Sequence, residues 1–471
     1  MKKQNLFENP VGIVLSDSTT MSCTMQIFEE SERGNLREGM FLIIRTLKNR
    51  NILVRLASIT PKNSFYEVGD AWTEARRKKL NIPEQVSRKY EIGVLDLLFE
   101  INLETHSRND IRIPPHPGDK VYLIDPEKHI KSIFGANKKS KGVIWYGSLY
   151  GYKDVKVPLD IEQLPMHLGI FGVTGSGKSF DTGVLIEKMV DIYYDETYKL
   201  AYPTLIVDAN GDYLDYIDYY QRENELGALS WIKRFVINKI RSRELINSGI
   251  DEDLIDNLAI NLDLISLRTL AEMIIVYYKG KKRGAELQIN GLERFLESKK
   301  DDFGSFNRVF TDKDKFFELK SALQGASSKL IHHGTKAAVT RALDKFYDIE
   351  KKFKIFSSPS DLKDINFIDR LTNLGGVLIL DLSANGCPGV PLEIKQLIVT
   401  YISSLLYRRF SEYKTDLSVS QKFLNFIVEE AQNFCPSSSY PVGTSLAKDI
   451  FSLIATQGRK FGLSLTMIKT L

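Results

Sequence analysis

The amino-acid sequence predicts an α/β protein with an N-terminal β-barrel and an inserted α-helical bundle. Short β-rich runs fill the first part of the chain, and near-continuous apolar runs alternate with helical periodicity after Pro158. A chain of 471 residues is also too long for one ordinary hydrophobic core. We therefore expect a barrel domain at 1–155, an α/β core in two parts at 156–242 and 366–471, and a helical insertion at 243–365.

The N-terminal region contains short runs rich in β-branched and aromatic residues, with turn residues between them, which is typical of strands. These runs are Gly12–Leu15, Gly39–Ile44, Ile52–Ile59, Asp119–Ile124 and Gly142–Tyr150. Pro114–Asp119 (PPHPGD) leads into a turn, since proline fixes φ and Gly118 permits a tight bend. Many short strands of this kind predict a small barrel.

After Pro158 the apolar runs are nearly continuous, as expected of parallel strands that are buried on both faces. They are Leu168–Phe171, Thr204–Val207, Phe235–Ile237, Gly376–Leu382 and Phe423–Val428. Helical periodicity lies between them, as in Pro391–Phe410. This alternation predicts a parallel sheet covered by helices.

No run of that kind occurs between about residues 243 and 365. Ile265–Tyr278 and Thr335–Phe353 have the amphipathic periodicity of helices. Because the segment is too long for a loop, we expect a helical subdomain that is inserted into the sheet.

Charge and cysteine content exclude few classes of protein. The 64 Lys and Arg residues against 60 Asp and Glu give a net charge of +4, so nucleic-acid binding would need a local basic surface. Cys23, Cys387 and Cys435 show no C-x-x-C spacing and are expected to be packing residues.

The sequence shows no signal peptide and no membrane span. Polar residues follow Lys2 and Lys3, and no apolar run approaches the roughly 20 residues that span a bilayer. We expect a cytoplasmic protein with no membrane association.

The segment GVTGSGKS, Gly172–Ser179, fits the phosphate-binding pattern G-x-x-x-x-G-K-[ST]. It follows an expected strand and opens an expected helix, a context that favours a P-loop over an accidental glycine-rich turn. Its backbone N–H groups would point at anions from a helix N-terminus, and glycines leave room for phosphates. Lys178 would contact the β- and γ-phosphates of ATP, and the Ser179 hydroxyl would bind Mg²⁺. The predicted nucleotide-binding residues of this loop are Gly172, Thr174, Gly175, Ser176, Gly177, Lys178 and Ser179.

Two carboxylates, Glu429 and Glu430, directly follow the apolar run Phe423–Val428 in the segment FLNFIVEEAQ. A P-loop ATPase needs one acidic group near Mg²⁺ and another that orients the attacking water. Glu429 fits the first role and Glu430 the second. Without the P-loop, such a pair would indicate only a solvated strand terminus.

Asp208 follows another expected core strand, in TLIVDANGDY. The carboxyl ends of parallel strands converge on the ligand crevice, so Asp208 would help to order Mg²⁺ or water. The alternative is an Asx-turn, which Asp208 and Gly211 would form in any case. The sequence leaves both open.

Arg459 and Lys460 lie between two glycines in GRKFG, just before a final strand-like run. One interpretation is an ordinary exposed loop. The other is a cationic contact to the γ-phosphate held by a neighbouring subunit, where an arginine stabilises transition-state charge.

In this order, the motifs resemble the HerA-type ATPases of the HerA/FtsK superfamily. The resemblance covers nearly the whole chain and is weakest in the inserted helices. His167 precedes the P-loop strand, and Asp212 stands where the family has Glu. The segments that carry the resemblance are PPHPGD, WYGSLY, VPLDIEQLPMHLGIFGVTGSGKS, TLIVDANGDY, GGVLILDLS, IVEEAQ and GRKFG.

The resemblance implies a RecA-like P-loop core, a barrel that helps to assemble a homo-hexamer, and a ring that moves double-stranded DNA with ATP. Lys178 and Ser179 match the Walker A pair, and Glu429 and Glu430 match the Walker B pair. Arg459 and Lys460 match the cationic motif that contacts ATP in trans. The implied partners are nucleases of the NurA type, or a nuclease or NADase effector in anti-phage defence.

The sequence departs from the family pattern at two places. Thr456-Gln457 stands where an Arg-Glu pair is common. Family chains also continue past the final strand into a Gln-Arg-Pro segment, another strand and a C-terminal arm, whereas this sequence stops at Leu471. We expect the C-terminal end of the family pattern to be lacking.

Two functions from different classes remain open: an ATP-driven DNA translocase, and a nucleotide-regulated ring scaffold that activates a separate effector enzyme. Candidate DNA contacts are basic clusters that solvated surfaces would also explain, although ring symmetry multiplies even a few charges. The clusters are Arg76–Lys79, Lys138–Lys141 and Lys279–Arg283.

Overall fold

The computed structural model forms two compact units, residues 1–160 and 161–471. The structure describes residues 9–32, 36–86, 88–135, 142–149, 152–190, 192–193, 199–213, 231–237, 239–280, 284–383, 390–416, 418, 420–436 and 446–470. Cys387, Lys138–Lys141 and residues 281–283 of the third basic cluster lie outside these ranges.

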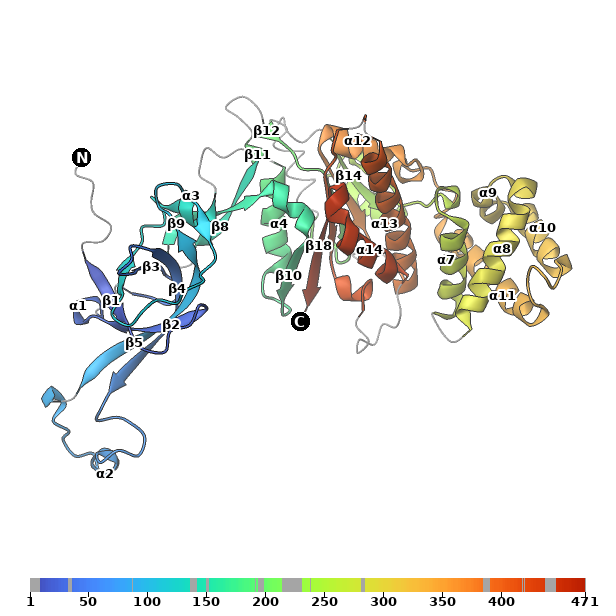
Figure 1. Cartoon of the computed structure of the whole chain (residues 1–471). Helices are drawn as coiled ribbons and strands as arrows, with labels where there is room; N and C mark the ends of the chain where they lie inside the picture. Colours follow the sequence, from blue (N-terminus) through green and yellow to red (C-terminus); the bar gives the residue numbers. More distant parts are fainter. Residues whose placement is uncertain are drawn as a thin grey trace. The chain divides into compact units, whose positions relative to one another are not determined.

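The first unit contains a closed antiparallel barrel, which confirms the predicted N-terminal fold (Figure 1). Pairing of β2 with β5 closes the ring, and alternate side chains such as Met25, Leu42 and Val54 fill its interior at 0% exposure. Around the barrel the strands are β2 (Ser22–Ile27), β1 (Pro10–Val14), β7 (Lys120–Leu123), β3 (Phe41–Arg45), β4 (Asn51–Asn63) and β5 (Lys89–Ile101).

Several elements of this unit lie outside the predicted runs. Glu91, Asp96 and Glu100 interrupt the apolar pattern of β5, although alternate positions of the strand are buried. The remaining elements outside these runs are α1 (Glu29–Glu32), α2 (Thr73–Arg77), the 3₁₀ helix η1 (Glu84–Val86), β6 (Arg108–Asn109), α3 (Ile130–Phe134) and β9 (Tyr152–Asp160). Strand β9 forms a hairpin with β8 (Val143–Leu149), which lies within the predicted run Gly142–Tyr150.

Strands β4 and β5 are long enough to extend past the barrel as a paired arm that carries α2 (Figure 1). We use "the arm" for residues 61–86 and 88–91. Its pairing ends at Asn63 opposite Lys89, and Val68, Leu80 and Val86 are exposed on it. The arm therefore presents apolar side chains that the described residues do not cover.

The second unit is built on a parallel sheet, as predicted. The buried runs become strands because neither face meets water: β13, β16 and β17 are buried along their whole length. In sheet order the strands are β10 (Leu168–Gly172), β18 (Leu463–Thr470), β17 (Leu424–Val428), β13 (Thr204–Asp208), β16 (Gly376–Asp381), β14 (Trp231–Val236) and β15 (Ile255–Asn257).

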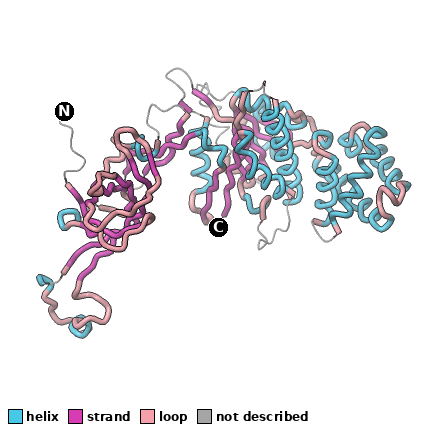
Figure 2. Tube along the Cα trace, viewed as in Figure 1, coloured by secondary structure: helices cyan, strands magenta, loops and turns pink. Residues whose placement is uncertain are grey.

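Helices cover both faces of this sheet (Figures 1 and 2). Alternate strand residues such as Leu205 and Phe426 pack with α13 and α14, whereas Ile206 and Ile427 pack with α4 and α6. The covering helices are α4 (Lys178–Met189), α6 (Lys239–Asn247), α12 (Asn366–Leu374), α13 (Leu392–Thr415) and α14 (Ala447–Phe461). Short elements between them are η2 (Ile161–Met166), β11 (Ile192–Tyr193), β12 (Lys199–Leu200), η3 (Glu252–Leu254), η4 (Leu262–Leu264), η5 (Asp361–Lys363) and η6 (Ala431–Asn433).

The final strand β18 is a core strand, because it pairs with β10 on one side and β17 on the other. It therefore joins the strand that leads into Gly172–Ser179 to the strand that Glu429 follows. Gly462 precedes it with a φ of 88°, a conformation that favours glycine and ends α14.

The inserted helical bundle is present, and its helices pack through one apolar cluster (Figure 1). They are α7 (Leu267–Lys279), α8 (Ala285–Phe303), α9 (Phe306–Thr311), α10 (Lys313–Gly325) and α11 (His333–Phe353). The segment 243–365 also contains a strand that no apolar run indicates, since β15 pairs in parallel with β14 at the sheet edge. With the sequence IDN, β15 is too short and too polar to produce an apolar run.

Among the described residues, no helix combines the length and the apolar character needed to cross a bilayer. Cys23 is buried in the barrel, as expected of a packing residue, and Cys435 is partly buried.

Candidate active site

The predicted site residues other than Arg459 and Lys460 lie at the carboxyl edge of the parallel sheet. Gly172 ends β10, Asp208 ends β13, Asp381 ends β16, and Glu429 follows β17. Because all these strands are parallel, their ends meet at one edge. The sheet thus brings together residues that are more than 200 positions apart in the sequence.

The P-loop connects β10 to α4, the context expected for Gly172–Ser179. Gly175 and Gly177 have φ values of 78° and 88°, and a Cβ at either would meet nothing within 4 Å. Their positive φ, rather than crowding within the chain, therefore requires glycine. Lys178 Nζ donates a 3.0 Å hydrogen bond to Val173 O, so the ammonium lies back over the loop.

Ser179 links the P-loop to Glu429. Its Oγ donates a hydrogen bond of 3.2 Å to Glu429 Oε1, while Glu429 Oε2 accepts one of 3.1 Å from Ala209 N. A hydroxyl and a carboxylate held side by side are the oxygen donors that Mg²⁺ prefers. In the described part of the chain no group of three His, Cys, Asp or Glu side chains is arranged to hold a metal by itself. The donor set therefore fits a Mg²⁺ ion that also takes ligands from nucleotide phosphates.

Burial, together with the charges of Asp208 and Asp212, raises the pKa of Glu429 to about 8. Glu429 is only 2% exposed, so its ionised form lacks solvent. A cation at this position would relieve that cost.

Glu430 has a φ of 50° and a ψ of 45°, an uncommon left-handed conformation for a residue with a Cβ. It is partly exposed, and its carboxylate accepts a hydrogen bond from the Gln432 amide. The sharp turn separates the neighbouring carboxylates: that of Glu429 is buried, whereas Glu430 remains accessible to water.

Asp208 is fully buried and forms the predicted Asx-turn. Its Oδ1 accepts hydrogen bonds from Gly211 N at 2.7 Å and Asp212 N at 3.1 Å. Its Oδ2 accepts one of 2.9 Å from the Arg234 guanidinium. Both oxygens are thus engaged within the chain, and a contact of Asp208 with Mg²⁺ or water stays a prediction.

Arg234 is a charged residue of the site edge that no local motif indicates. It is 0% exposed, and it bridges Asp208 at 2.9 Å and Asp381 at 2.8 Å. Burial by itself raises the pKa of Asp381, but Arg234 and Ser383 outweigh it and hold that pKa below its usual value. For Asp208, burial prevails over the attraction of Arg234 and raises the pKa. Arg234 therefore ties the ends of β13 and β16 together beneath the site.

Lys395 is a second site residue without a sequence signal. It lies in the first turn of α13, and its Nζ is 3.4 Å from Ala209 O. Burial lowers the pKa of Lys395, while four carboxylates act in the opposite direction: Asp381, Asp208, Glu429 and Glu430.

Arg459 and Lys460 are not beside the P-loop of their own chain. They are exposed in the last turn of α14, so the interpretation as a loop is wrong. Because β18 begins only after them, at Leu463, they lie at the amino edge of the sheet, and the P-loop lies at the carboxyl edge. A five-residue strand separates the edges by about 16 Å.

His167 fixes the end of α14 to the start of the P-loop strand. Its Nε2 donates to Ala455 O at 3.0 Å, and its Nδ1 accepts from Leu465 N at 3.1 Å. A Cβ at Gly458 would lie 2.6 Å from Leu463 O, so this close approach explains a glycine within the helix.

Gln457, one of the departures from the family pattern, accepts a hydrogen bond of 2.6 Å from the Tyr407 hydroxyl.

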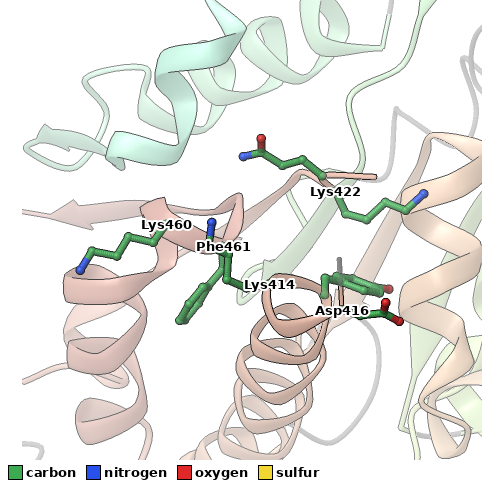
Figure 3. Close-up of a pocket in the computed structure, with 7 residues that line it drawn as sticks. Lys414, Asp416, Lys422, Lys460 and Phe461 are labelled. Atoms are coloured by element: carbon green, nitrogen blue, oxygen red, sulfur yellow. The ribbon is translucent and has the colours of Figure 1, made fainter. Parts of the chain in front are cut away.

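A cavity of about 190 Å³ adjoins Lys460, at the ends of α13 and α14 (Figure 3). Its lysines do not converge, since Lys460 and Lys422 point to opposite sides in Figure 3. Lys414 and Lys460 stand in the last turns of their helices, where cations offset the negative end of the dipole. The cavity therefore has a local structural explanation and is not the nucleotide site.

Residues 144–406 match the family model described as "Helicase HerA, central domain". The chain is 26% identical over 359 residues to the DNA double-strand break repair helicase HerA of Saccharolobus solfataricus, an alignment that covers 76% of this chain and 59% of the relative. It is 25% identical over 401 residues to a probable helicase of Methanocaldococcus jannaschii, covering 83% of this chain and 65% of the relative.

The HerA of Sulfolobus acidocaldarius is 23% identical over 359 residues, which cover 76% of this chain and 60% of that protein. The chain thus spans about three fifths of the length of these relatives. The matched family model covers more than half of the chain and includes the P-loop and the ends of β13 and β16. The chain therefore belongs to the HerA helicase family.

Proposed function

We propose that the chain is the subunit of a homo-hexameric, ATP-hydrolysing motor that moves along or unwinds double-stranded DNA. The observation that carries the proposal is the 3.2 Å contact between Ser179 and Glu429, with Glu430 next in sequence. It joins the P-loop to a buried and an accessible carboxylate, the parts that ATP hydrolysis requires.

Each residue of the site has a distinct role in this proposal. Lys178 leaves Val173 O and binds the β- and γ-phosphates, and the N–H groups of the P-loop surround them. Ser179 and Glu429 hold Mg²⁺, which offsets the charge of the phosphates when bound. Glu430 accepts a hydrogen bond from the attacking water and orients it toward the γ-phosphate.

The cations needed for hydrolysis come from two subunits in this proposal. Arg459 and Lys460 are exposed at the edge of the sheet opposite their own P-loop. In a ring, Arg459 and Lys460 would contact the γ-phosphate of the ATP bound by the neighbouring subunit. A guanidinium there stabilises the charge that develops during hydrolysis. The barrel domain would support such a ring.

DNA binding is the part that the names of the relatives suggest, since two of them are called double-strand break repair helicases. The test is ATP hydrolysis by the purified oligomer with and without double-stranded DNA, over a range of salt concentrations. We expect Mg²⁺-dependent hydrolysis that DNA stimulates, with less stimulation as salt rises. A rate indifferent to DNA contradicts the proposal.

The ring-scaffold alternative draws support from the arm. Val68, Leu80 and Val86 are 105%, 59% and 70% exposed there, which suits a surface that binds a partner such as a nuclease or NADase effector. A co-purifying effector whose activity survives Glu430→Gln, a variant that should bind ATP without hydrolysing it, would favour the scaffold. Loss of effector activity in that variant would favour the motor.

A further inference from the structure

Lys395 is held loosely in a crowded acidic environment. Its hydrogen bond to Ala209 O is 3.4 Å long, at the weak end of the range for such bonds. It is the fourth residue of α13, and a helix N-terminus repels a cation. The helix therefore does not stabilise the positive charge of Lys395. The nearby carboxylates stabilise it instead.

A short chain of contacts connects Lys395 to the P-loop. Lys395 Nζ contacts Ala209 O, Ala209 N donates to Glu429 Oε2, and Glu429 Oε1 accepts from Ser179 Oγ. The lysine thus touches the same peptide segment that holds the candidate Mg²⁺ carboxylate.

The charges of this edge are unevenly compensated. Four carboxylates act electrostatically on Lys395: Asp381, Asp208, Glu429 and Glu430. Arg234 already uses Nε for Asp381 and a terminal nitrogen for Asp208. Glu429 and Glu430 make no ion pair among the described residues, so the Lys395 ammonium is a cation available to them.

We propose that Lys395 is the resident counter-charge of the candidate Mg²⁺ site: its ammonium offsets the carboxylates while no nucleotide is bound and yields when Mg²⁺ arrives. This inference rests on the proposed ATPase function. Lys395 is a positioning residue in this scheme, because it acts through Ala209 and Glu429 and not on the substrate. Its long side chain, which makes one weak hydrogen bond within the described residues, lets the ammonium move away at little cost.

The scheme makes Lys395 a competitor of the metal, which can be measured without nucleotide. The probe is Mn²⁺ alone, titrated at pH 8 into the full-length protein and followed by electron paramagnetic resonance. Lys395→Met keeps most of the side-chain volume and removes the charge. We expect it to bind Mn²⁺ roughly tenfold more tightly than the wild type, because a positive charge near a divalent ion is removed.

Two variants control for structural effects. Lys336 is the fourth residue of α11, as Lys395 is of α13, and its Nζ donates to Gln324 O at 3.0 Å. Lys336→Met, far along the chain in the helical bundle, should leave Mn²⁺ affinity unchanged. Lys395→Arg keeps the charge and should bind Mn²⁺ as weakly as the wild type.

Equal Mn²⁺ affinity in Lys395→Met and the wild type, or no detectable binding to Lys395→Met, overturns the inference. The inference is also overturned if Lys395→Arg raises the Mn²⁺ affinity as much as Lys395→Met does. The assay of DNA-stimulated ATP hydrolysis by the wild type is separate. A wild type that responds to DNA while Lys395→Met binds Mn²⁺ normally refutes only the role of Lys395.

Discussion

Ser179 Oγ donates a 3.2 Å hydrogen bond to Glu429 Oε1 across 250 positions of sequence. The bond joins the second residue of α4 to the end of β17, and β18 lies between the P-loop strand and β17. The fold of the chain therefore places the oxygen ligands suited to Mg²⁺ next to each other. The sheet itself provides this preorganisation, and four predictions on individual residues follow from it.

Glu430→Gln should leave ATP binding intact and slow hydrolysis by roughly 10²- to 10⁴-fold, since an amide cannot accept the proton of the attacking water. Binding of a fluorescent ATP analogue and steady-state phosphate release measure the two effects. An unchanged hydrolysis rate would remove Glu430 from the mechanism. Weakened nucleotide binding with normal turnover would assign it to binding instead.

Lys178→Ala should abolish ATP binding without loss of stability. Its ammonium contacts only Val173 O among the described residues, so the fold loses one exposed hydrogen bond. The thermal midpoint without nucleotide should stay within about 1 °C of the wild type, since surface substitutions cost little. The stabilisation by ATP seen in the wild type should disappear. A large fall in the midpoint would show a structural role for Lys178.

The P-loop and the buried strands could be predicted from the sequence because their signals are local. Gly172–Ser179 specify a loop by themselves, and runs such as Thr204–Val207 reveal double-sided burial. Strand β15 could not be predicted in this way, because its residues Ile255, Asp256 and Asn257 carry no apolar pattern and pair only at a sheet edge.

The charged residues beneath the site could not be predicted, because their partners are distant in sequence. Arg234 lies in β14, which is next to β16 and two strands away from β13, and only this sheet order brings its side chain to both Asp381 and Asp208. Lys395 has the appearance of an ordinary helix residue. The helical setting of Arg459 was obscured by Gly458, which normally breaks helices but here permits the close approach of Leu463.

Glu429→Gln should stabilise the metal-free protein at pH 8 and have little effect near pH 4.5. Burial raises the pKa of Glu429 from 4.5 to about 8, so the folded protein keeps a proton that the unfolded chain releases between these values. The contribution of Glu429 to the free energy of unfolding therefore falls as the pH rises from 4.5 to about 8. We expect a gain on the order of 2–4 kcal/mol for the variant at pH 8, measured by urea unfolding. An equal gain in the free energy of unfolding of Glu429→Gln at pH 4.5 and pH 8 would contradict the raised pKa of Glu429.

Arg234→Met should destabilise the protein by about 3–5 kcal/mol at pH 7, because it leaves the buried Asp208 without its cation, whereas Asp381 keeps Arg241 at 3.0 Å. The neighbouring residue offers a matched control. Lys233 pairs with Asp361 at 3.1 Å near the surface, so Lys233→Met should cost less than about 1 kcal/mol. Urea unfolding of both variants measures the difference. Equal losses would show that the buried ion network does not stabilise the sheet edge.

The central claim is that each ATP site is completed by a neighbouring subunit, and mixed oligomers test it most directly. Lys178→Ala keeps Arg459 and Lys460, whereas Arg459→Ala keeps the P-loop and both carboxylates. Each variant alone should be inactive. An equimolar mixture, unfolded and reassembled together, should recover up to about a quarter of the wild-type rate, because one interface in four pairs an intact P-loop with an intact arginine. A mixture no more active than the separate variants would contradict the shared site.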